Sequence, residues 1–553
     1  MALTKEIQEL DPYGSLDDSK KKKDLFEVSK NDGPYGSPNY PIGASRKITQ
    51  EELENMLGYI PYSNNNCEIV KNNGTDEENG IRLLNAVASC YAKTPNGLPL
   101  SNTNRAITYV LAGQYNLVEQ TLELSEFVDI IGIGNSRGIV ITGSSSAQTI
   151  KVLNNNNYSL FNLTIENIGV GKSLSHNSNQ TDNGRWDNIV INTKIDTPAI
   201  WSGIYNNITA EVDNVMWGDI EGLVSNSSFR NNSCGYSPGS TTTISGNIIK
   251  CSALSNSFGS TGGGSSIISG IIEDCVAIDN SFGHSNEPDV DTYYTQISGS
   301  IKNCTARDKS FGYAKSGYVN ISGLIENSNS RDYSFAHTDS TSKYVTILGV
   351  ITNCTGRDYC FASRGGGVEL ASIQSIVIDC TGRDFCFGYS PTLTSGAILG
   401  TVENCNATSF GATSFGAGKL INCTGNYLRG PQAGEINRCN FINQSGSIVD
   451  VASISDSCVL RYSTFIQLEP TKDSIKIDSG ASVKISHCEL NQDFNLISGD
   501  PYTNLIYLPR NVIWDEKAEY FVSPYTSPDG FYHRFKKYVG TDGEFQTEDL
   551  GPV

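Results

Sequence analysis

The feature that most constrains the fold is a phrase that returns along the middle of the chain, with the one-letter pattern I-x-G-x-I-x-N-C-x-x-R-D-x-S-F-G. Its clearest copy runs from Ile297 to Gly312, and two further copies contain Cys354 and Cys380. In this part of the chain the copies lie about 24 to 29 residues apart. Self-similarity with a period of roughly 20 to 50 residues indicates one supersecondary unit stacked many times. The repeat therefore predicts a solenoid.

Within each copy, apolar and small residues alternate in a way that is typical of a β-strand. Ile297, Gly299 and Ile301 illustrate the alternation. A period of two with β-branched residues favours a strand, because a helix would place these side chains on different faces. The glycine indicates a place where a larger side chain would not fit. Equivalent strands of successive copies are expected to lie side by side in parallel, about 4.8 Å apart.

The positions that repeat most strictly are predicted to form stacked columns, with one residue from each turn. These structural columns include Asn303, Cys304, Asn353, Cys354, Cys380, Phe311, Phe361 and Phe387. Such columns resemble the internal ladders of right-handed parallel β-helices of the pectate-lyase-like fold. The resemblance covers about residues 100 to 500. It implies an all-β chain that forms a single-stranded right-handed parallel β-helix.

Three parts are predicted along the chain. Residues 1–75 would form an extended N-terminal arm with a short helix, for which Thr49 and Glu52 form a capping box. Residues 76–500 would form the β-helix. Residues 501–553 are rich in aromatic residues and would form a C-terminal cap, an oligomerisation segment or a tip, because a solenoid end needs a cover against edge-to-edge aggregation.

The N-terminal part also contains the phrase Leu57-Gly-Tyr-Ile-Pro61, which is similar to a Leu-Gly-Tyr-x-Pro phrase common in tail fibres of bacteriophages. Together with the β-helix it resembles a phage tail spike or tail fibre protein. That resemblance implies a virion protein whose arm attaches to other tail or capsid proteins and whose β-helix binds a host surface polysaccharide. Tail spikes of this fold are usually homotrimers, so it also implies a homotrimer.

Composition and charge disfavour some classes of binding partner. The net charge of −19 disfavours nucleic acid and anionic membranes. No run of about 18 apolar residues is present, so no membrane insertion is expected. Residues Met1 to Asp11 lack the apolar stretch of a signal peptide, which predicts folding in the host cytoplasm.

The chain contains 15 cysteines, most of them at one phase of the repeat, which favours buried reduced thiols over disulfides. Metal ligation is not expected either. Ser281, Ser310 and Ser334 replace Cys360 in other copies, so that position requires a small side chain rather than a ligand. No cofactor is expected.

Arg-Asp pairs recur in four successive copies of the repeat: Arg307/Asp308, Arg331/Asp332, Arg357/Asp358 and Arg383/Asp384. Paired carboxylates could bind or cleave a polysaccharide. A catalytic site is a single asymmetric arrangement, however, whereas this pair is repeated. We therefore interpret the pairs as lateral ion pairs between neighbouring turns. The opposite charges of Lys302 and Glu326, two positions before the cysteine column, favour the same interpretation.

The glycan-binding surface is expected on the loops between Phe-Gly and the next strand, because insertions in solenoid repeats gather on one face. The candidate binding residues are Tyr293, Tyr294, Tyr313, Tyr318, Tyr344, Arg364 and Tyr389. Aromatic side chains beside polar groups suit stacking of sugar rings. They suit packing against another subunit equally well.

The leading functional hypothesis is a structural and binding role in a virion. One alternative is a polysaccharide depolymerase, either a glycoside hydrolase or a lyase, and another is a purely architectural tail or capsid component. No cluster of acids clearly breaks the repeat, so the sequence favours a non-enzymatic protein and leaves any catalytic residues unidentified. Acids outside the repeat that an enzyme could use are Asp187, Asp213, Asp219 and Glu221.

Overall fold

A computed structural model gives the fold of the chain. It describes residues 24–29, 45–49 and 66–552, except for residues 144–147, 154–156, 169–173, 177–180, 193–198, 287–292, 316, 340–344, 358, 365–370, 383–386, 388–395, 411–414, 430, 444–451, 455–456, 469–474, 478–482, 487, 491–496, 500–520, 527–531 and 540–544. The chain divides into two compact units, unit 1 (Met1–Val212) and unit 2 (Asp213–Val553). None of the described helices is long and apolar enough to cross a membrane.

Unit 1 is built around a row of parallel strands that begins at β3 (Cys67–Val70). β3 pairs with β4, β4 with β7, β7 with β10, β10 with β13 and β13 with β15. A second row joins β5, β8 and β10, and a third joins β6, β9 and β11. The bounds are β4 Ala106–Leu111, β5 Gly113–Asn116, β6 Leu122–Leu124, β7 Val128–Ile133, β8 Ile139–Gly143, β9 Ile150–Val152, β10 Ser159–Asn167, β11 Leu174–His176, β12 Thr181–Asp182, β13 Arg185–Ile191, β14 Ala199–Trp201 and β15 Ile204–Ala210.

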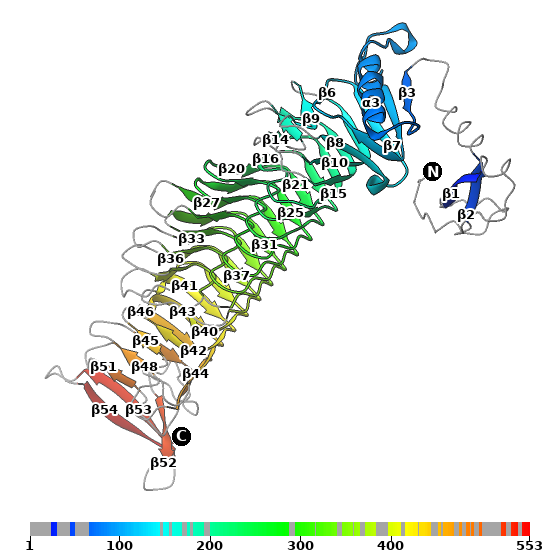
Figure 1. Cartoon of the computed structure of the whole chain (residues 1–553). Helices are drawn as coiled ribbons and strands as arrows, with labels where there is room; N and C mark the ends of the chain where they lie inside the picture. The colour runs from blue at the N-terminus through cyan, green and yellow to red at the C-terminus, as the bar shows by residue number, and fades with distance from the viewer. Residues whose placement is uncertain are drawn as a thin grey trace. The chain divides into compact units, whose positions relative to one another are not determined.

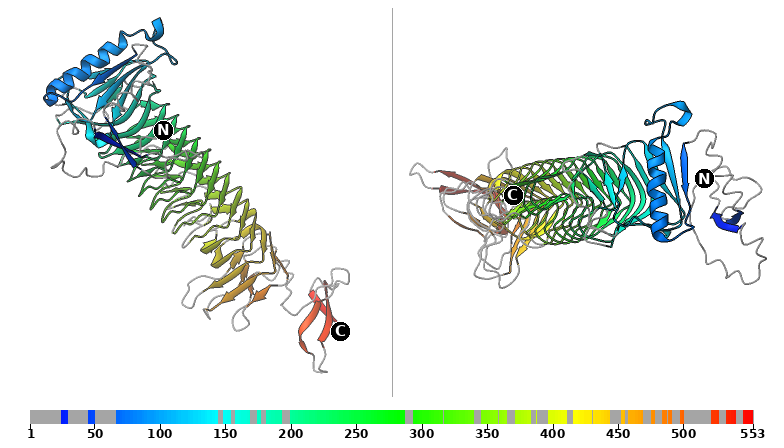
Figure 2. Two further views of the ribbon diagram at one scale, coloured as in Figure 1. Left: turned by 90° about the vertical axis from the view of Figure 1, so that its right-hand side faces the viewer. Right: turned by 45° about the horizontal axis from the view of Figure 1, so that its top comes forward.

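Helix α3 (Asp76–Tyr91) packs against the first strands of unit 1, as Figure 2 shows in blue. The Thr75 hydroxyl accepts a hydrogen bond from the Glu78 backbone N–H, and the Glu78 carboxylate accepts one from the Thr75 N–H, which completes a capping box. Leu83 and Val87 are buried on its inner face. Residues 76–91 lie within the range 76–500 that the sequence analysis assigned to the β-helix, and they form this helix.

Unit 2 contains a regular coil in which each turn, or rung, contributes one short strand to each of three parallel sheets. Figure 1 shows β20, β27, β33 and β36 following one another along one side, and β21, β25, β31 and β37 along another. Sheet A comprises β16 Gly218–Ile220, β20 Thr242–Ile244, β24 Ser266–Ile268, β27 Tyr294–Ile297, β30 Tyr318–Ile321, β33 Val345–Ile347, β36 Ala371–Ile373 and β38 Gly396–Ile398.

The other two sheets of the coil are formed in the same way. Sheet B comprises β17 Leu223–Ser225, β21 Asn247–Ile249, β25 Ile271–Glu273, β28 Ser300–Lys302, β31 Leu324–Glu326, β34 Val350–Thr352, β37 Ile376–Ile378 and β39 Thr401–Glu403, and it continues through β41 Phe415–Ile421, β43 Pro431–Asn437, β46 Ser457–Arg461 and β49 Val483–Ser486. Sheet C comprises β19 Tyr236–Ser237, β23 Ser260–Thr261, β26 His284–Ser285, β29 Tyr313–Ala314, β32 His337–Thr338 and β35 Ser363–Arg364.

Small strands complete the part of unit 2 that follows the regular coil. They also pair in parallel and include β40 Asn406–Phe410, β42 Thr424–Arg429, β44 Asn440–Asn443, β45 Ala452–Ile454, β47 Thr464–Gln467, β48 Ile475–Ile477, β50 Glu489–Leu490 and β51 Ile497–Gly499. The predicted all-β parallel β-helix is therefore confirmed by the strand pairings of both units.

The corner between sheets A and B requires glycine because the backbones of successive rungs approach closely there. A Cβ atom on Gly323 would lie 2.0 Å from the carbonyl oxygen of Gly299, and one on Gly299 would lie 2.1 Å from that of Gly270. Real Cβ atoms are not found so close to backbone oxygen. The repeated glycine is thus a steric requirement of the rung.

The bend after sheet B contains the predicted asparagine column. Asn303 and Asn327 both have positive φ, at 52° and 50°, a conformation that asparagine tolerates better than most residues. The side-chain amide of Asn327 donates to Asn303 at 3.1 Å, and that of Asn353 donates to Asn327 at 2.7 Å. The amides therefore satisfy one another from rung to rung.

The core is filled by columns of identical or similar side chains. Phe311 stacks between Phe282 and Phe335, and the column continues through Phe361 to Phe387, with centroids of neighbouring rings 4.7 to 4.9 Å apart. Cys304, Cys354 and Cys380 are buried in a second column. All described cysteines are free thiols. The thiol of Cys304 donates to the Lys302 carbonyl at 3.1 Å, so this buried polar atom has a partner.

Both ends of the chain carry antiparallel strands. β1 (Asp24–Ser29) pairs with β2 (Ser45–Thr49). β52 (Phe521–Thr526), β53 (Tyr532–Val539) and β54 (Phe545–Pro552) form a three-stranded sheet. Thr49 therefore belongs to a strand, while the rest of the short helix predicted after it and the Leu57–Pro61 phrase lie outside the described residues.

Candidate functional site

The outer face of sheet A carries two of the predicted glycan-binding tyrosines in a column. Tyr294 on β27 and Tyr318 on β30 are in register, and their rings stack with centroids 4.9 Å apart and planes 7° from parallel. Both side chains are half-buried, as is Tyr293 just before the strand. Because the two rings cover each other's inner faces, they offer a ligand their edges and hydroxyl groups. The column is thus not the row of open platforms that the sequence analysis expected.

A polar row runs beside these tyrosines, two residues further along each strand. Gln296 pairs in register with Asn320, and both are half-buried on the outer face. Towards the start of sheet A this row is interrupted by the apolar Ile267 and then continues with Thr243. The outer face of sheet A therefore combines aromatic edges with amide and hydroxyl groups, which suits hydrogen bonding to polyhydroxylated ligands.

Asp219 on β16 begins this polar row. Its Oδ1 atom accepts a hydrogen bond from the Thr243 backbone N–H at 2.7 Å. Burial raises the pKa of Asp219, and the nearby Glu221 carboxylate raises it further, against the lowering effect of that hydrogen bond. Glu221 itself is exposed at the corner between sheets A and B. This end of sheet A is consequently acidic.

Tyr313 does not lie on an accessible loop surface, contrary to the sequence analysis. It is 0% exposed and stacks between two buried histidines, His284 at 5.0 Å and His337 at 5.7 Å, on sheet C. Tyr333 and Tyr359, which stack on each other at 5.2 Å, pack edge-on against His337. The Lys309 ammonium also lies 5.2 Å from the centre of the Tyr313 ring, so Tyr313 is enclosed by these contacts and does not reach the surface.

The polar groups of this cluster determine its electrostatics. The Tyr313 hydroxyl donates to Asp339, and His337 Nε2 lies 3.0 Å from the other Asp339 oxygen. Burial alone would raise the pKa of Asp339, but the contacts with His337 and Tyr313 outweigh it and lower the pKa. Burial, helped by the positive charge of Lys309, lowers the pKa of His284 to about 3. At neutral pH this histidine is therefore an uncharged stacking partner.

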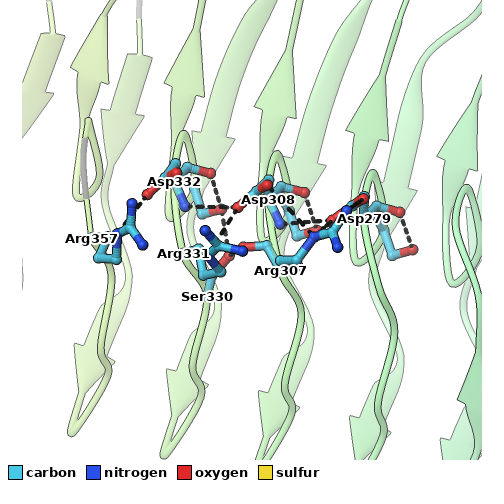
Figure 3. Close-up of polar contacts among 10 residues, drawn as sticks. Asp279, Arg307, Asp308, Ser330, Arg331, Asp332 and Arg357 are labelled. Carbon is cyan, nitrogen blue, oxygen red and sulfur yellow. Dashed lines mark hydrogen bonds and ion pairs between the residues drawn. The ribbon is translucent and has the colours of Figure 1, made fainter.

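The Arg-Asp pairs form a column of alternating charges on the outside of the coil, which Figure 3 shows in close-up. Arg307 contacts Asp279 at 2.5 Å, Arg331 contacts Asp308 at 3.9 Å and Arg357 contacts Asp332 at 3.3 Å, so each guanidinium pairs with the carboxylate of the preceding rung. Lys302 and Glu326 on sheet B also pair, at 3.3 Å. Among the described pairs each carboxylate has a cationic partner, and the column offers no distinctive group for catalysis.

The remaining candidates are placed less completely. Arg364 lies in β35, and Tyr344 and Tyr389 lie outside the described residues. Of the acids named for an enzyme, Asp187 accepts hydrogen bonds from Asn206 and Asn207 in unit 1, and Asp213 accepts one from the Asn231 N–H in unit 2. In the described part of the chain, no group of three His, Cys, Asp or Glu side chains is arranged to hold a metal ion.

Three aromatic residues near these sites were missed by the sequence analysis. Trp217 precedes β16 and stands in the same outward column as Tyr294, because Ile220 pairs with Ile244 and the register of sheet A is continuous. Tyr333 and Tyr359 directly follow the Arg-Asp pairs. The recurrence of tyrosine at one position of the repeat could have identified Tyr333 and Tyr359. The sequence analysis interpreted this part of the repeat only as Arg-Asp pairs.

Comparison with known proteins gives limited further information. No protein-family model matches the chain, and no curated protein matches it in sequence. Among solved structures, the A-module of the mannuronan C-5 epimerase AlgE4 of Azotobacter vinelandii is similar at 11% identity, over 78% of this chain and 94% of that one, with a TM-score of 0.20. Tailspike protein 3 of bacteriophage CBA120 is similar at 10% identity, over 97% of this chain and 75% of that one, also with a TM-score of 0.20.

Proposed function

We propose that this chain is a polysaccharide-binding β-helix protein of the tail-spike type, which uses the outer face of sheet A to hold a surface glycan. The observation that carries the proposal is the stacked, half-exposed pair Tyr294 and Tyr318 with Gln296 and Asn320 beside it. Aromatic edges with hydroxyl and amide groups at a fixed spacing supply both the apolar contact and the hydrogen bonds that sugars require.

The rung spacing supports an extended ligand. Neighbouring parallel strands lie about 4.8 Å apart, so equivalent side chains recur at a distance comparable to the advance of one sugar unit along an extended polysaccharide. A rigid stack needs little rearrangement to present such a row, which reduces the entropy lost on binding. The negative net charge of −19 favours neutral over anionic glycans.

In the same proposal the N-terminal part attaches the protein to other tail or capsid components of a virion, and the protein acts as a homotrimer. The phrase Leu57-Gly-Tyr-Ile-Pro61 supports attachment, through its similarity to phage tail fibres. The trimer is proposed from the usual state of tail spikes with a β-helix. Light scattering of the purified full chain would measure the assembly directly, and a monomer at micromolar concentration would contradict it.

The binding proposal is tested by replacing matched tyrosine pairs. The variant Tyr294→Ala/Tyr318→Ala should lower affinity for a bound polysaccharide at least tenfold, measured by affinity electrophoresis or calorimetry. The control is Tyr333→Ala/Tyr359→Ala, which removes an equally stacked and half-buried pair from the bends that precede sheet C. Equal loss in both variants, or no loss in either, would contradict the placement of the glycan on sheet A.

A second candidate function, cleavage of the bound polysaccharide, is favoured by one observation. Asp219 has a raised pKa and a neighbouring carboxylate, Glu221, and a carboxyl group that keeps its proton longer than usual suits a general acid. Release of reducing ends by the native protein, lost in Asp219→Asn, would establish this function. Retention of an intact polymer after prolonged incubation would leave binding alone.

A further inference from the structure

An uncharged surface runs along the corner between sheets A and B, from the rung of β25 to the rung of β39. The exposed corner residues of these rungs are Ser269, Ser298, Ser322, Leu348, Gln374 and Leu399. Two residues further along, the first outward column of sheet B comprises Ile271, Ser300, Leu324, Val350, Ile376 and Thr401. We define these two columns together as the uncharged stripe.

Charged residues begin at the next outward position of the same strands. This second outward column comprises Glu273, Lys302, Glu326, Thr352, Ile378 and Glu403. Beyond β39 the first column becomes charged as well, because Lys419 and Glu435 follow Thr401 in register. The stripe is therefore bounded by charges along one side and at one end, in a chain whose net charge is −19.

The stripe is apolar between β31 and β39. Leu348, Ile376 and Leu399 are 45%, 40% and 43% exposed, although they are large hydrophobic residues. Leu324 and Val350 beside them are half-buried. An exposed apolar patch surrounded by polar groups is typical of a protein–protein contact. These five side chains have no hydrogen-bonding groups, so they suit a protein surface better than a sugar.

The charge pattern fits another copy of the same chain. Copies that each carry a charge of −19 repel one another, so a close contact requires a surface without carboxylates. A symmetry axis parallel to the coil, above the first column, would bring each rung opposite the same rung of another copy. The corner residues of one copy then lie opposite the second column of the other. Glu326 would face Ser322 and Glu403 would face Leu399, so like charges do not meet.

An antiparallel contact has a less favourable charge pattern. A symmetry axis perpendicular to the coil, between β34 and β37, would also bring the apolar residues of two copies together. It would reverse the order of the rungs, however, and place Glu326 of one copy opposite Glu403 of the other. Like charges placed opposite each other in an interface cost free energy. The pattern therefore favours parallel coils.

We propose that the uncharged stripe is the surface along which copies of this chain associate side by side, with parallel coils and equal rungs at the same height. The inference deepens the homotrimer of the proposed function and rests on it. It places Val350 and Ile376 nearest the symmetry axis and the charged second column towards the edge of each contact. The apolar residues between β31 and β39 supply the main attraction.

The test introduces charge into the stripe. Ile376→Glu would bring the carboxylates of all copies together near the axis and should weaken self-association at least tenfold, measured by light scattering of the full chain over a concentration series. The matched control is Val276→Glu, because Val276 is also apolar, is 52% exposed and lies outside the stripe. Leu399→Glu, which would face Glu403 of another copy, repeats the test at a second position.

A mixing experiment separates a lost contact from a lost fold. Equal amounts of Ile376→Glu and Ile376→Lys should form assemblies that neither variant forms alone, because opposite charges then meet near the axis. Circular dichroism checks the fold of each variant. Weaker assembly of Ile376→Glu and Leu399→Glu, native assembly of Val276→Glu and recovery in the mixture together support the stripe.

The remaining outcomes distinguish the two proposals. Assembly of Ile376→Glu and Leu399→Glu as strong as that of the native chain would overturn the stripe and keep the homotrimer. Equal weakening in Val276→Glu would also overturn the stripe, because the effect would then follow from net charge and not from position. A native chain that is monomeric at micromolar concentration would overturn the homotrimer and the stripe together.

Discussion

Arg307 holds the carboxylate of Asp279, 28 residues earlier, in a two-point contact. Its Nε and Nη2 atoms donate to the two carboxylate oxygens at 2.9 and 2.5 Å. Asp308, the neighbour of Arg307 in the sequence, lies 3.8 Å from the guanidinium. The pairing therefore runs towards the preceding rung, and Arg331 and Arg357 repeat it. The charge column therefore links successive rungs of the coil.

Because this charge column is exposed to solvent, it contributes little to the free energy of folding. Because the Arg307 side chain is half-exposed, solvent screens its attraction to Asp279. We expect Arg307→Ala to leave the urea midpoint of unfolding unchanged within experimental error, and to leave glycan binding unchanged as well. A folded Arg307→Ala protein that no longer binds glycan would show that the column is a ligand site after all.

The glycine corner should be far less tolerant. Gly323→Ala would place a Cβ atom 2.0 Å from the Gly299 carbonyl oxygen, so two rungs would have to move apart. We expect a clear loss of thermal stability or of soluble protein, measured by circular dichroism and yield. Gly239→Ala is the matched control, because a Cβ atom there meets nothing within 4 Å. Equal stability of the two variants would disprove the steric requirement.

The phenylalanine column should carry a large share of the stability. Phe335 is 0% exposed and stacks on Phe311 and Phe361, both at 4.9 Å. Phe335→Ala should lower the free energy of unfolding by about 3 to 5 kcal/mol, since it removes a buried ring and leaves a cavity. Urea titration measures this, with Ile271→Ala as a control at a side chain that is 42% exposed. A loss as small as that of the control would contradict the prediction.

Acid should weaken sheet C through its buried histidines. The pKa of His284 is about 3 in the fold and near 6.5 in the unfolded chain, so below pH 6.5 the unfolded chain binds a proton that the folded chain does not. Stability should therefore fall as pH drops from about 6.5 to 3, by about 1.4 kcal/mol for each pKa unit of difference. The pKa of His337 is also lowered by burial and adds to the same trend.

Other charged groups also face His284 and His337. The charges of Lys309 and Lys315 help to lower the pKa of His284, while Asp339, whose pKa is lowered, loses its stabilising contacts only below its ordinary pKa of 3.8. His284→Phe keeps a ring to stack on Tyr313 but cannot be protonated. Urea midpoints at pH 8 and pH 5 should differ less for this variant than for the native chain. An equal difference would exclude His284 as the source.

The packing of residues that point into the coil could be predicted from the sequence, because these residues have the same surroundings in every rung. Gly299 and Gly323 meet the same backbone contact, and Phe311 and Phe335 fill the same space, so identical residues recur at one spacing. The partner of each is its own equivalent in the next rung. For such residues, the repeat alone is enough to predict both the fold and the neighbour.

Outward positions could not be predicted in the same way. Tyr313 and Tyr318 are five residues apart and both were expected to face a ligand, yet Tyr313 is buried between His284 and His337 while Tyr318 remains half-exposed. Helix α3 was missed for a similar reason, because its apolar face is explained only by its packing against β3, β4, β5 and β7.

The repeat by itself thus determined that the chain coils into a parallel β-helix, with asparagine, cysteine and phenylalanine stacked at its bends and in its core. Tertiary structure decided which aspartate each arginine meets and which tyrosines reach the surface. The physical reason is that an inward side chain packs against its own copy, at a distance set by strand spacing. An outward side chain packs against the loop beside it. Because these loops differ from rung to rung, the sequence shows no repeat from which the packing of outward side chains could be predicted.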